Sequence, residues 1–283
     1  MVIEALTNPI KAENKPWTLL FIGIIYSTLA VFLSLWIFRE HASLVMIFLM
    51  CLASIPLMYA TLKLEEQKDL EISKESVLLR EHAKALSFLM FLFFGITVSL
   101  TFWYLVLPGD IASKLFSIQT ETIVNINNQV AGNAISSTIV LMRIFLNNFK
   151  VLLFCLLFSF IYGLGAIFIL IWNASVIAAA LGNFIRVNIA KYVSAVGLLK
   201  AGAYLQVASL GFFRYAIHGI PEIAAYFVGG LAGGIISIAV IRHDFGTSNF
   251  TRILFDSVDL IIVSISLLIF AALVEVYITP VLF

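Results

Sequence analysis

The chain has 283 residues, of which 62% are apolar and only 12% are charged, and its mean hydropathy is +1.07. Water-soluble domains average about half apolar and a quarter charged residues, so this composition excludes a water-soluble globular protein. The net charge of +1 gives no basic surface for nucleic acid, and we expect no nucleic-acid partner. Most of the chain must face lipid or other apolar helices.

Apolar segments that could cross a bilayer recur along the whole chain. A membrane-spanning helix needs about 20 mostly apolar residues. Six segments meet this length: Trp17–Ile37, Ala42–Leu62, Ala85–Pro108, Lys150–Trp172, Ile220–Ile241 and Ile253–Tyr277. All four tryptophans lie at or near segment ends, as in the aromatic belts of membrane proteins. We predict an all-α, polytopic transmembrane helix bundle that forms one integral domain over residues 1–283 of a multi-pass cell-membrane protein.

Three connections between these segments have distinct compositions. Lys63–Lys84 carries many charges of both signs and is typical of a solvated helix. Gly109–Phe149 is polar at its centre and predicts amphipathic helices on the membrane surface. Ser175–Gly182 is apolar but too short to span, which favours a half-helix or re-entrant element. The chain thus divides into a three-span part (1–108), an extramembrane connection (109–149) and a core (150–283).

The distribution of Lys and Arg predicts the orientation. If Ser175–Gly182 returns to the side from which it came, the side of the N-terminus holds 11 of these residues and the other side 6. If this segment crosses the membrane, the count becomes 9 against 8. The positive-inside rule therefore favours the re-entrant topology with a cytoplasmic N-terminus.

Four acidic residues lie within or at the edges of apolar segments, where an ionisable group is costly and is a candidate functional residue. The last two segments are joined by about eleven residues and should form an antiparallel hairpin. Glu222 lies about twenty residues before the tip and Glu275 about twenty-two after it, so both should lie on one membrane side. Asp256 and Asp259 are three residues apart, hence on one helix face, near the tip on the opposite side.

The sequence His218-Gly219-Ile220-Pro221-Glu222 allows two interpretations. Proline suits the first turn of a helix, and a carboxylate there is favoured by the helix dipole, so the segment can be a helix start with a hydrogen-bonded histidine. Alternatively, His218 and Glu222 form a pair, completed by Glu275, that binds a metal or relays protons. No H-E-x-x-H motif supports zinc, and we expect no metal ion or other cofactor.

Further polar and small residues have structural interpretations. Amides can bond to backbone groups freed at helix ends, and such residues bracket the fourth span: Asn147, Asn148 and Asn173. Glycines at close-packing spacing indicate tightly packed helices in this chain or between chains: Gly163, Gly165, Gly229, Gly230, Gly233 and Gly234. The two cysteines, Cys51 and Cys155, lie in apolar runs and should pack as small hydrophobic residues.

These residues together resemble the stage II sporulation protein M family. The similar stretch extends from Ile144 to Pro280 and includes IFLNNFK, HGIPEIAAYFVGGLAGG and AALVEVYITP; the N-terminal part is similar to the archaeal branch. The resemblance implies a polytopic helical membrane protein. It also implies a set of family positions: Asn147, Asn148, Asn173, His218, Gly219, Glu222 and Glu275. Bacterial members act with cell-wall hydrolases during engulfment, as a membrane component rather than as the hydrolase.

Three hypotheses for the function remain open. The first is a non-catalytic component that organises the membrane or envelope, with lipid, other membrane or envelope proteins, or a second copy of the chain as partners. The second is a transporter or channel for a small solute or proton that uses the Glu/His cluster. The third is an intramembrane enzyme acting on a lipid-like substrate, although the sequence has no P-loop, C-x-x-C or G-x-S-x-G motif.

Overall fold

The structure, a computed structural model, describes residues 8–72, 74–131, 137–162, 166–189, 198–241 and 246–282. Apart from short turns, these residues form helices and none of them is in a strand. In chain order the elements are α1 (Pro9–Asn14), α2 (Thr18–Ile37), η1 (Arg39–His41), α3 (Ala42–Glu71), α4 (Glu75–Val106), α5 (Gly109–Leu115), α6 (Ser117–Ala131), α7 (Ser137–Tyr162), α8 (Ala166–Ile189), α9 (Leu198–Ile241), α10 (Ser248–Leu273), the π-helical turn η3 (Val274–Ile278) and α11 (Thr279–Leu282). The predicted all-α helix bundle is confirmed.

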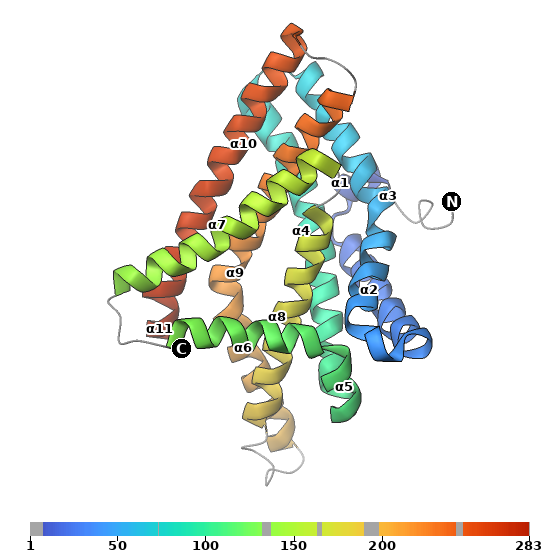
Figure 1. The fold of residues 1–283 in the computed structure, drawn as a ribbon, viewed down its shortest axis with the longest axis vertical. Helices are drawn as coiled ribbons and strands as arrows, with labels where there is room; N and C mark the ends of the chain where they lie inside the picture. The colour runs from blue at the N-terminus through green and yellow to red at the C-terminus, as the bar shows by residue number, and fades with distance from the viewer. Residues whose placement is uncertain are drawn as a thin grey trace.

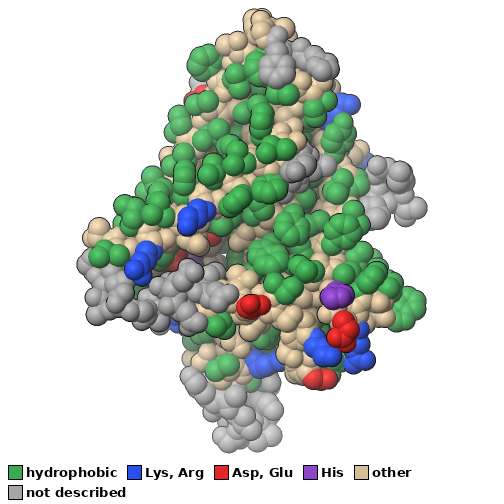
Figure 2. Space-filling model, in the orientation of Figure 1, with side chains coloured by type: hydrophobic (Ala, Val, Ile, Leu, Met, Phe, Trp, Pro, Cys, Tyr) green, Lys and Arg blue, Asp and Glu red, His purple; other side chains and the backbone are tan. Residues whose placement is uncertain are grey.

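Seven of the described helices are long and apolar enough to cross a membrane: α2, α3, α4, α7, α8, α9 and α10 with its continuation through η3 and α11. Most of them run up and down through the bundle, α7 crosses it obliquely, and α6 lies across its lower part (Figure 1). Figure 2 shows hydrophobic side chains over most of the visible face, with few charged groups among them. Exposed apolar surface of this extent fits a bundle surrounded by lipid.

The predicted fourth span and the re-entrant element after it are wrong. Helix α7 ends at Tyr162 and α8 begins at Ala166, so the apolar run 150–172 contains the end of one helix and the start of the next. Ser175–Gly182 is the middle of α8, a continuous helix of 24 residues. The run is apolar throughout, and hydropathy by itself therefore does not locate the break. The predicted packing glycines Gly163 and Gly165 lie outside the described residues.

Two connections also differ from the prediction. Lys63–Lys84 is not a separate solvated helix but the end of α3 and the start of α4, and it buries four ionisable side chains: Glu65, Glu66, Asp69 and His82. The connection 109–149 contains the expected short helices α5 and α6, but α7 already begins at Ser137. The cysteines Cys51 and Cys155 are buried and free, as expected.

Helix α9 lies at the centre of the stretch from Ile144 to Pro280 that carries the family resemblance. It packs closely against its neighbours through its glycines. A Cβ atom on Gly233 would collide with the backbone carbonyl of Leu156 in α7, and one on Gly230 would lie 2.9 Å from the Cβ of Ala166 in α8. A Cβ on Gly234 would lie 2.5 Å from a methyl group of Leu62 in α3. Gly229 is in similarly close contact with α7. These four glycines therefore meet helices of the same chain.

Candidate functional site

Polar side chains of α9 and of η3 and α11, which continue α10, lie together inside the bundle. The Tyr226 hydroxyl donates a 2.8 Å hydrogen bond to Oε1 of Glu222. The Oγ1 of Thr279 lies 3.3 Å from Nδ1 of His218. Glu275 is close enough to Glu222 for their charges to interact. We call these five residues the α9–α10 polar cluster.

The α9 members of this cluster share one helix face. His218, Glu222 and Tyr226 are spaced four residues apart and project in nearly the same direction. The segment 218–222 is not a helix start, because α9 continues from Leu198 to Ile241 with Pro221 inside it. Proline removes one backbone donor within a helix, and the surrounding helices hold the segment in helical form. The predicted helix start is therefore wrong, and His218 bonds to Thr279 rather than to Glu222 or Glu275.

The α10 side of the cluster is positioned by the π-helical turn η3. Glu275 belongs to this turn, and the hydroxyl of Thr279 also lies 3.2 Å from the carbonyl oxygen of Val274. Single π-helical turns insert one residue into a helix and often occur at functional sites. Tyr226 and Thr279 were missed in the sequence, although each lies four residues after one of the predicted acids, the spacing at which helical side chains meet.

The predicted helix-end amides lie in helix interiors, so that prediction is wrong. Asn147 and Asn148 are in the middle of α7, and Nδ2 of Asn147 lies 3.4 Å from Oδ1 of Asn148. Asn173 is in α8, where its Nδ2 donates to the carbonyl of Ile169 at 2.8 Å. The close contacts of the α9 glycines with α7 and α8 set the register of the three helices. In this register the amides lie at about the level of Glu222 and Tyr226.

The cluster is arranged as a link between helices. It holds two carboxylates, an imidazole, a phenol and a hydroxyl, and it joins α9 to the end of α10. In the part of the chain that the structure describes, no three His, Cys, Asp or Glu side chains converge in a way that could hold a metal ion. The described residues therefore do not bring together the donor set that the metal-binding interpretation requires.

A second cluster, which sequence reasoning missed, lies at the other end of the bundle. Nδ1 of His82 is 2.7 Å from Oε2 of Glu65, and its Nε2 is 2.9 Å from Oδ1 of Asp69. Nζ of Lys68 bonds to Glu65 at 2.8 Å and to Glu13 at 2.7 Å. Each contact of the imidazole needs a proton between nitrogen and oxygen, which an imidazolium between two carboxylates supplies. We call these five residues the α3–α4 charge cluster.

One of the two acids predicted near the hairpin tip faces this charge cluster. Oδ2 of Asp256 lies 3.9 Å from Nε of Arg252, and Asp256 is near enough to Asp69 and His82 for their charges to interact. Asp259 interacts with Asp256 through charge alone. Arg252 also donates to the backbone carbonyls of Leu70 and Ile72 at the end of α3. The tip of the α9–α10 hairpin therefore lies beside the α3–α4 connection. This is the arrangement expected when α8 crosses the membrane.

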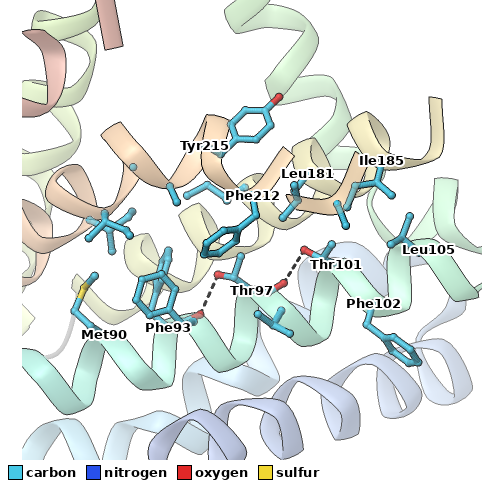
Figure 3. A pocket seen from close by; sticks show the side chains of 18 residues that line it. Met90, Phe93, Thr97, Thr101, Phe102, Leu105, Leu181, Ile185, Phe212 and Tyr215 are labelled. Atoms are coloured by element: carbon cyan, nitrogen blue, oxygen red, sulfur yellow. Dashed lines mark hydrogen bonds between the residues drawn. The ribbon is translucent and has the colours of Figure 1, made fainter. Parts of the chain in front are cut away.

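A cavity of about 320 Å³ lies between α4, α8 and α9 (Figure 3). Gly219, Ile220 and Ile223 line it, so it contacts the face of α9 next to the one that carries the polar cluster. Its other walls are almost entirely apolar, and the hydroxyls of Thr97 and Thr101 donate to carbonyls of their own helix at 2.9 and 2.8 Å. This cavity could not be predicted from the sequence, because its walls come from three separate apolar segments.

Comparison with protein families matches the family described as Stage II sporulation protein M to residues 85–280. The match begins in α4 and ends in α11, and it includes the cavity and the whole α9–α10 polar cluster. It also extends further toward the N-terminus than the motifs that carry the resemblance in the sequence. Comparison with curated proteins and with solved structures finds no match. Because the family match covers well over half of the chain, the chain belongs to the stage II sporulation protein M family.

Proposed function

We propose that this protein is a non-catalytic membrane component that organises partner proteins or the envelope around a rigid helical scaffold. The observation that carries the proposal is that polar side chains within the spans bond to other helices of the same chain. The link between His218 and Thr279 is one such contact. A scaffold needs a fixed arrangement of helices, and these bonds supply it.

A buried glutamine gives further support. Gln119 of α6 accepts a 2.8 Å hydrogen bond from Ser43 of α3 and donates a 3.3 Å bond to Ser175 of α8. One amide thereby ties the surface helix to two spans. Hydrogen bonds between membrane helices contribute about 0.6–2 kcal/mol each. Several of them together favour one packing arrangement over its alternatives.

Within this proposal the protein is a multi-pass protein of the cell membrane, an archaeal-type member of the family, with its N-terminal side in the cytoplasm. With α8 crossing the membrane, the side of the N-terminus holds 9 Lys and Arg residues and the other side 8. The excess has the direction that the positive-inside rule requires for a cytoplasmic N-terminus.

A second candidate function is proton or small-solute transport through the α9–α10 polar cluster. It is favoured by one observation, the approach of two partly buried carboxylates, Glu222 and Glu275, beside His218. Ionisable groups within a membrane span commonly mark ion pathways. In the scaffold proposal the same residues link helices and carry no flux.

Reconstitution of the purified full chain into sealed vesicles containing a pH-sensitive dye separates the two functions. After a pH gradient is imposed, the scaffold proposal predicts no proton flux above that of empty vesicles. Glu275→Gln, which retains the shape of the side chain and removes its charge, should then behave as the wild type. The exposed Glu40→Gln variant is the matched control. A flux that is lost in Glu275→Gln and retained in Glu40→Gln would overturn the scaffold proposal and establish the transporter.

Crosslinking in native membranes followed by purification tests the scaffold role itself. The proposal predicts one or more protein partners that are recovered at constant ratio to the chain. Recovery of lipid alone, under crosslinking that captures a known complex in the same membranes, would contradict a role in organising proteins.

A further inference from the structure

A second cavity, of about 210 Å³, lies where α2, η1 and α5 meet. Its walls come from Leu35 of α2, Arg39 of η1 and three residues of α5, Asp110, Ile111 and Lys114. The larger cavity has no charged wall residue, whereas three of the side chains here are charged. The volume is below the roughly 300–1,000 Å³ of typical ligand pockets, so this α2–α5 cavity admits a compact polar group.

The α2–α5 cavity lies at the ends of two membrane spans. Arg39 is two residues beyond the last residue of α2, and Asp110 is four residues beyond the last residue of α4. Trp36, in the last turn of α2, is 81% exposed, and exposed tryptophans are typical of the level at which lipid head groups begin. Figure 2 shows acidic and basic side chains gathered at the lower end of the bundle, below its apolar face. The cavity is therefore at the depth of the head groups.

The cations of the cavity are available to bind an anion. In the part of the chain that the structure describes, the exposed guanidinium of Arg39 forms no ion pair and no hydrogen bond. Nζ of Lys114 lies 3.8 Å from Oε1 of Glu40, and the two side chains are 56% and 80% exposed. An exposed ion pair at this distance contributes little to stability, so Lys114 can bind another oxygen at small cost. Arginine and lysine both bind phosphate oxygens.

The acidic residues decide which phosphate-containing group fits. The carboxylate of Asp110 lines the same cavity and forms no ion pair with a described residue. It repels a second negative charge and attracts an ammonium group. With Glu40, the site holds two cations and two carboxylates, so its net charge is zero. These charges complement a head group with one phosphate and one amine, and they favour it over an anionic head group.

We propose that the α2–α5 cavity binds the phosphoethanolamine head group of a membrane lipid. The phosphate binds Arg39 and Lys114, and the ammonium donates hydrogen bonds to Asp110. The apolar side chains of Leu35 and Ile111 are left to contact the glycerol backbone. The site is separate from the α9–α10 polar cluster, and the inference does not depend on the scaffold role.

Native mass spectrometry of the purified full chain tests the site. The chain in mild detergent is mixed with phosphatidylethanolamine, phosphatidylcholine or phosphatidylglycerol with the same acyl chains, and the fraction that retains one lipid is measured. We expect phosphatidylethanolamine to be retained at several-fold higher occupancy than the other two lipids. The choline nitrogen has no hydrogen to donate to Asp110, and phosphatidylglycerol has no ammonium group. Glycerophosphoethanolamine, which has the same head group without acyl chains, should bind far more weakly than the lipid.

Two matched pairs of variants test the individual residues. Asp110→Asn should reduce the retention of phosphatidylethanolamine to that of phosphatidylcholine, and Glu71→Gln should leave it unchanged. Arg39→Gln should weaken the retention of both lipids several-fold, and Arg80→Gln should not. The two control residues are exposed and lie beside the α3–α4 connection, at the opposite end of α3 from the cavity.

Equal retention of the three lipids by the unmodified chain would overturn the proposal, whether or not the variants fold. Unchanged lipid preference in Asp110→Asn, or unchanged retention in Arg39→Gln, would also overturn it. If glycerophosphoethanolamine binds as strongly as the lipid, the site takes a soluble phosphate ester and the assignment to a membrane lipid is wrong.

Discussion

Arg252, near the start of α10, donates a hydrogen bond to the backbone carbonyl of Ile72, the residue that directly follows the end of α3. The contact joins segments 180 residues apart. It places the tip of the last hairpin on the same side of the bundle as the α3–α4 connection. A re-entrant element before α9 would have placed the two on opposite sides.

This relationship predicts opposite accessibility for two exposed positions. Asn249 lies at the hairpin tip and Ser117 at the start of α6. In a variant without the native cysteines, Cys at these positions should react with a membrane-impermeant maleimide from opposite sides of the membrane. With a cytoplasmic N-terminus, Ser117→Cys is labelled in intact cells and Asn249→Cys only after permeabilisation. The reverse pattern inverts the orientation, and labelling of both positions in intact cells contradicts the seven-span topology.

His82→Ala should strongly destabilise the fold. The imidazole contacts two buried carboxylates, Glu65 and Asp69, and its removal leaves their charges without this partner. Breaking a buried ion pair costs about 3–5 kcal/mol, which should lower the melting temperature in detergent markedly. The exposed His41→Ala on η1 is the control and should melt as the wild type does. Equal melting of the two variants would show that the charge cluster does not stabilise the bundle.

Gly233→Leu should disrupt the contact between α7 and α9. Even a Cβ atom at this position meets the backbone of Leu156 and lies 3.2 Å from the backbone nitrogen of Phe160, and backbone atoms cannot move aside cheaply. Overpacking costs about 1–3 kcal/mol or more. Gly219→Ala, on the same helix with no atom within 4 Å of the new Cβ, should have little effect. Thermal melting reports the difference, and an unchanged melting temperature for Gly233→Leu would refute the close packing.

Tyr226→Phe should weaken the α9–α10 polar cluster without removing apolar volume. The buried hydroxyl donates to Glu222, and loss of a hydrogen bond to a buried acceptor costs about 1–3 kcal/mol. The exposed Tyr59→Phe is the matched control. In a double-mutant cycle with Glu222→Gln, a nonzero coupling free energy is expected. Strict additivity of the two substitutions would mean that the hydrogen bond does not contribute to stability.

The sequence by itself determined the fold class, which depends on composition. It also determined the relative depth of residues on the last two helices, which depends on the number of residues between them. Long apolar runs in a weakly charged chain can satisfy their backbone groups in lipid only as helices, which fixed the all-α class. The short link between the last two spans placed Glu222 and Glu275 on one side, because residue number converts directly to depth along two antiparallel helices.

The tertiary structure decided what depends on contacts between distant segments. Hydropathy is uniform across the end of α7 and the start of α8, so hydropathy by itself located neither their boundary nor the crossing of α8. The acids Glu65 and Asp69 look solvated in the sequence, because their burial depends on a histidine across the α3–α4 connection. The cavity exists only where α4, α8 and α9 leave space between them. In lipid, a helix face that is exposed and one that is buried are both apolar, so hydropathy does not distinguish them. The packing of the helices alone determined these sites.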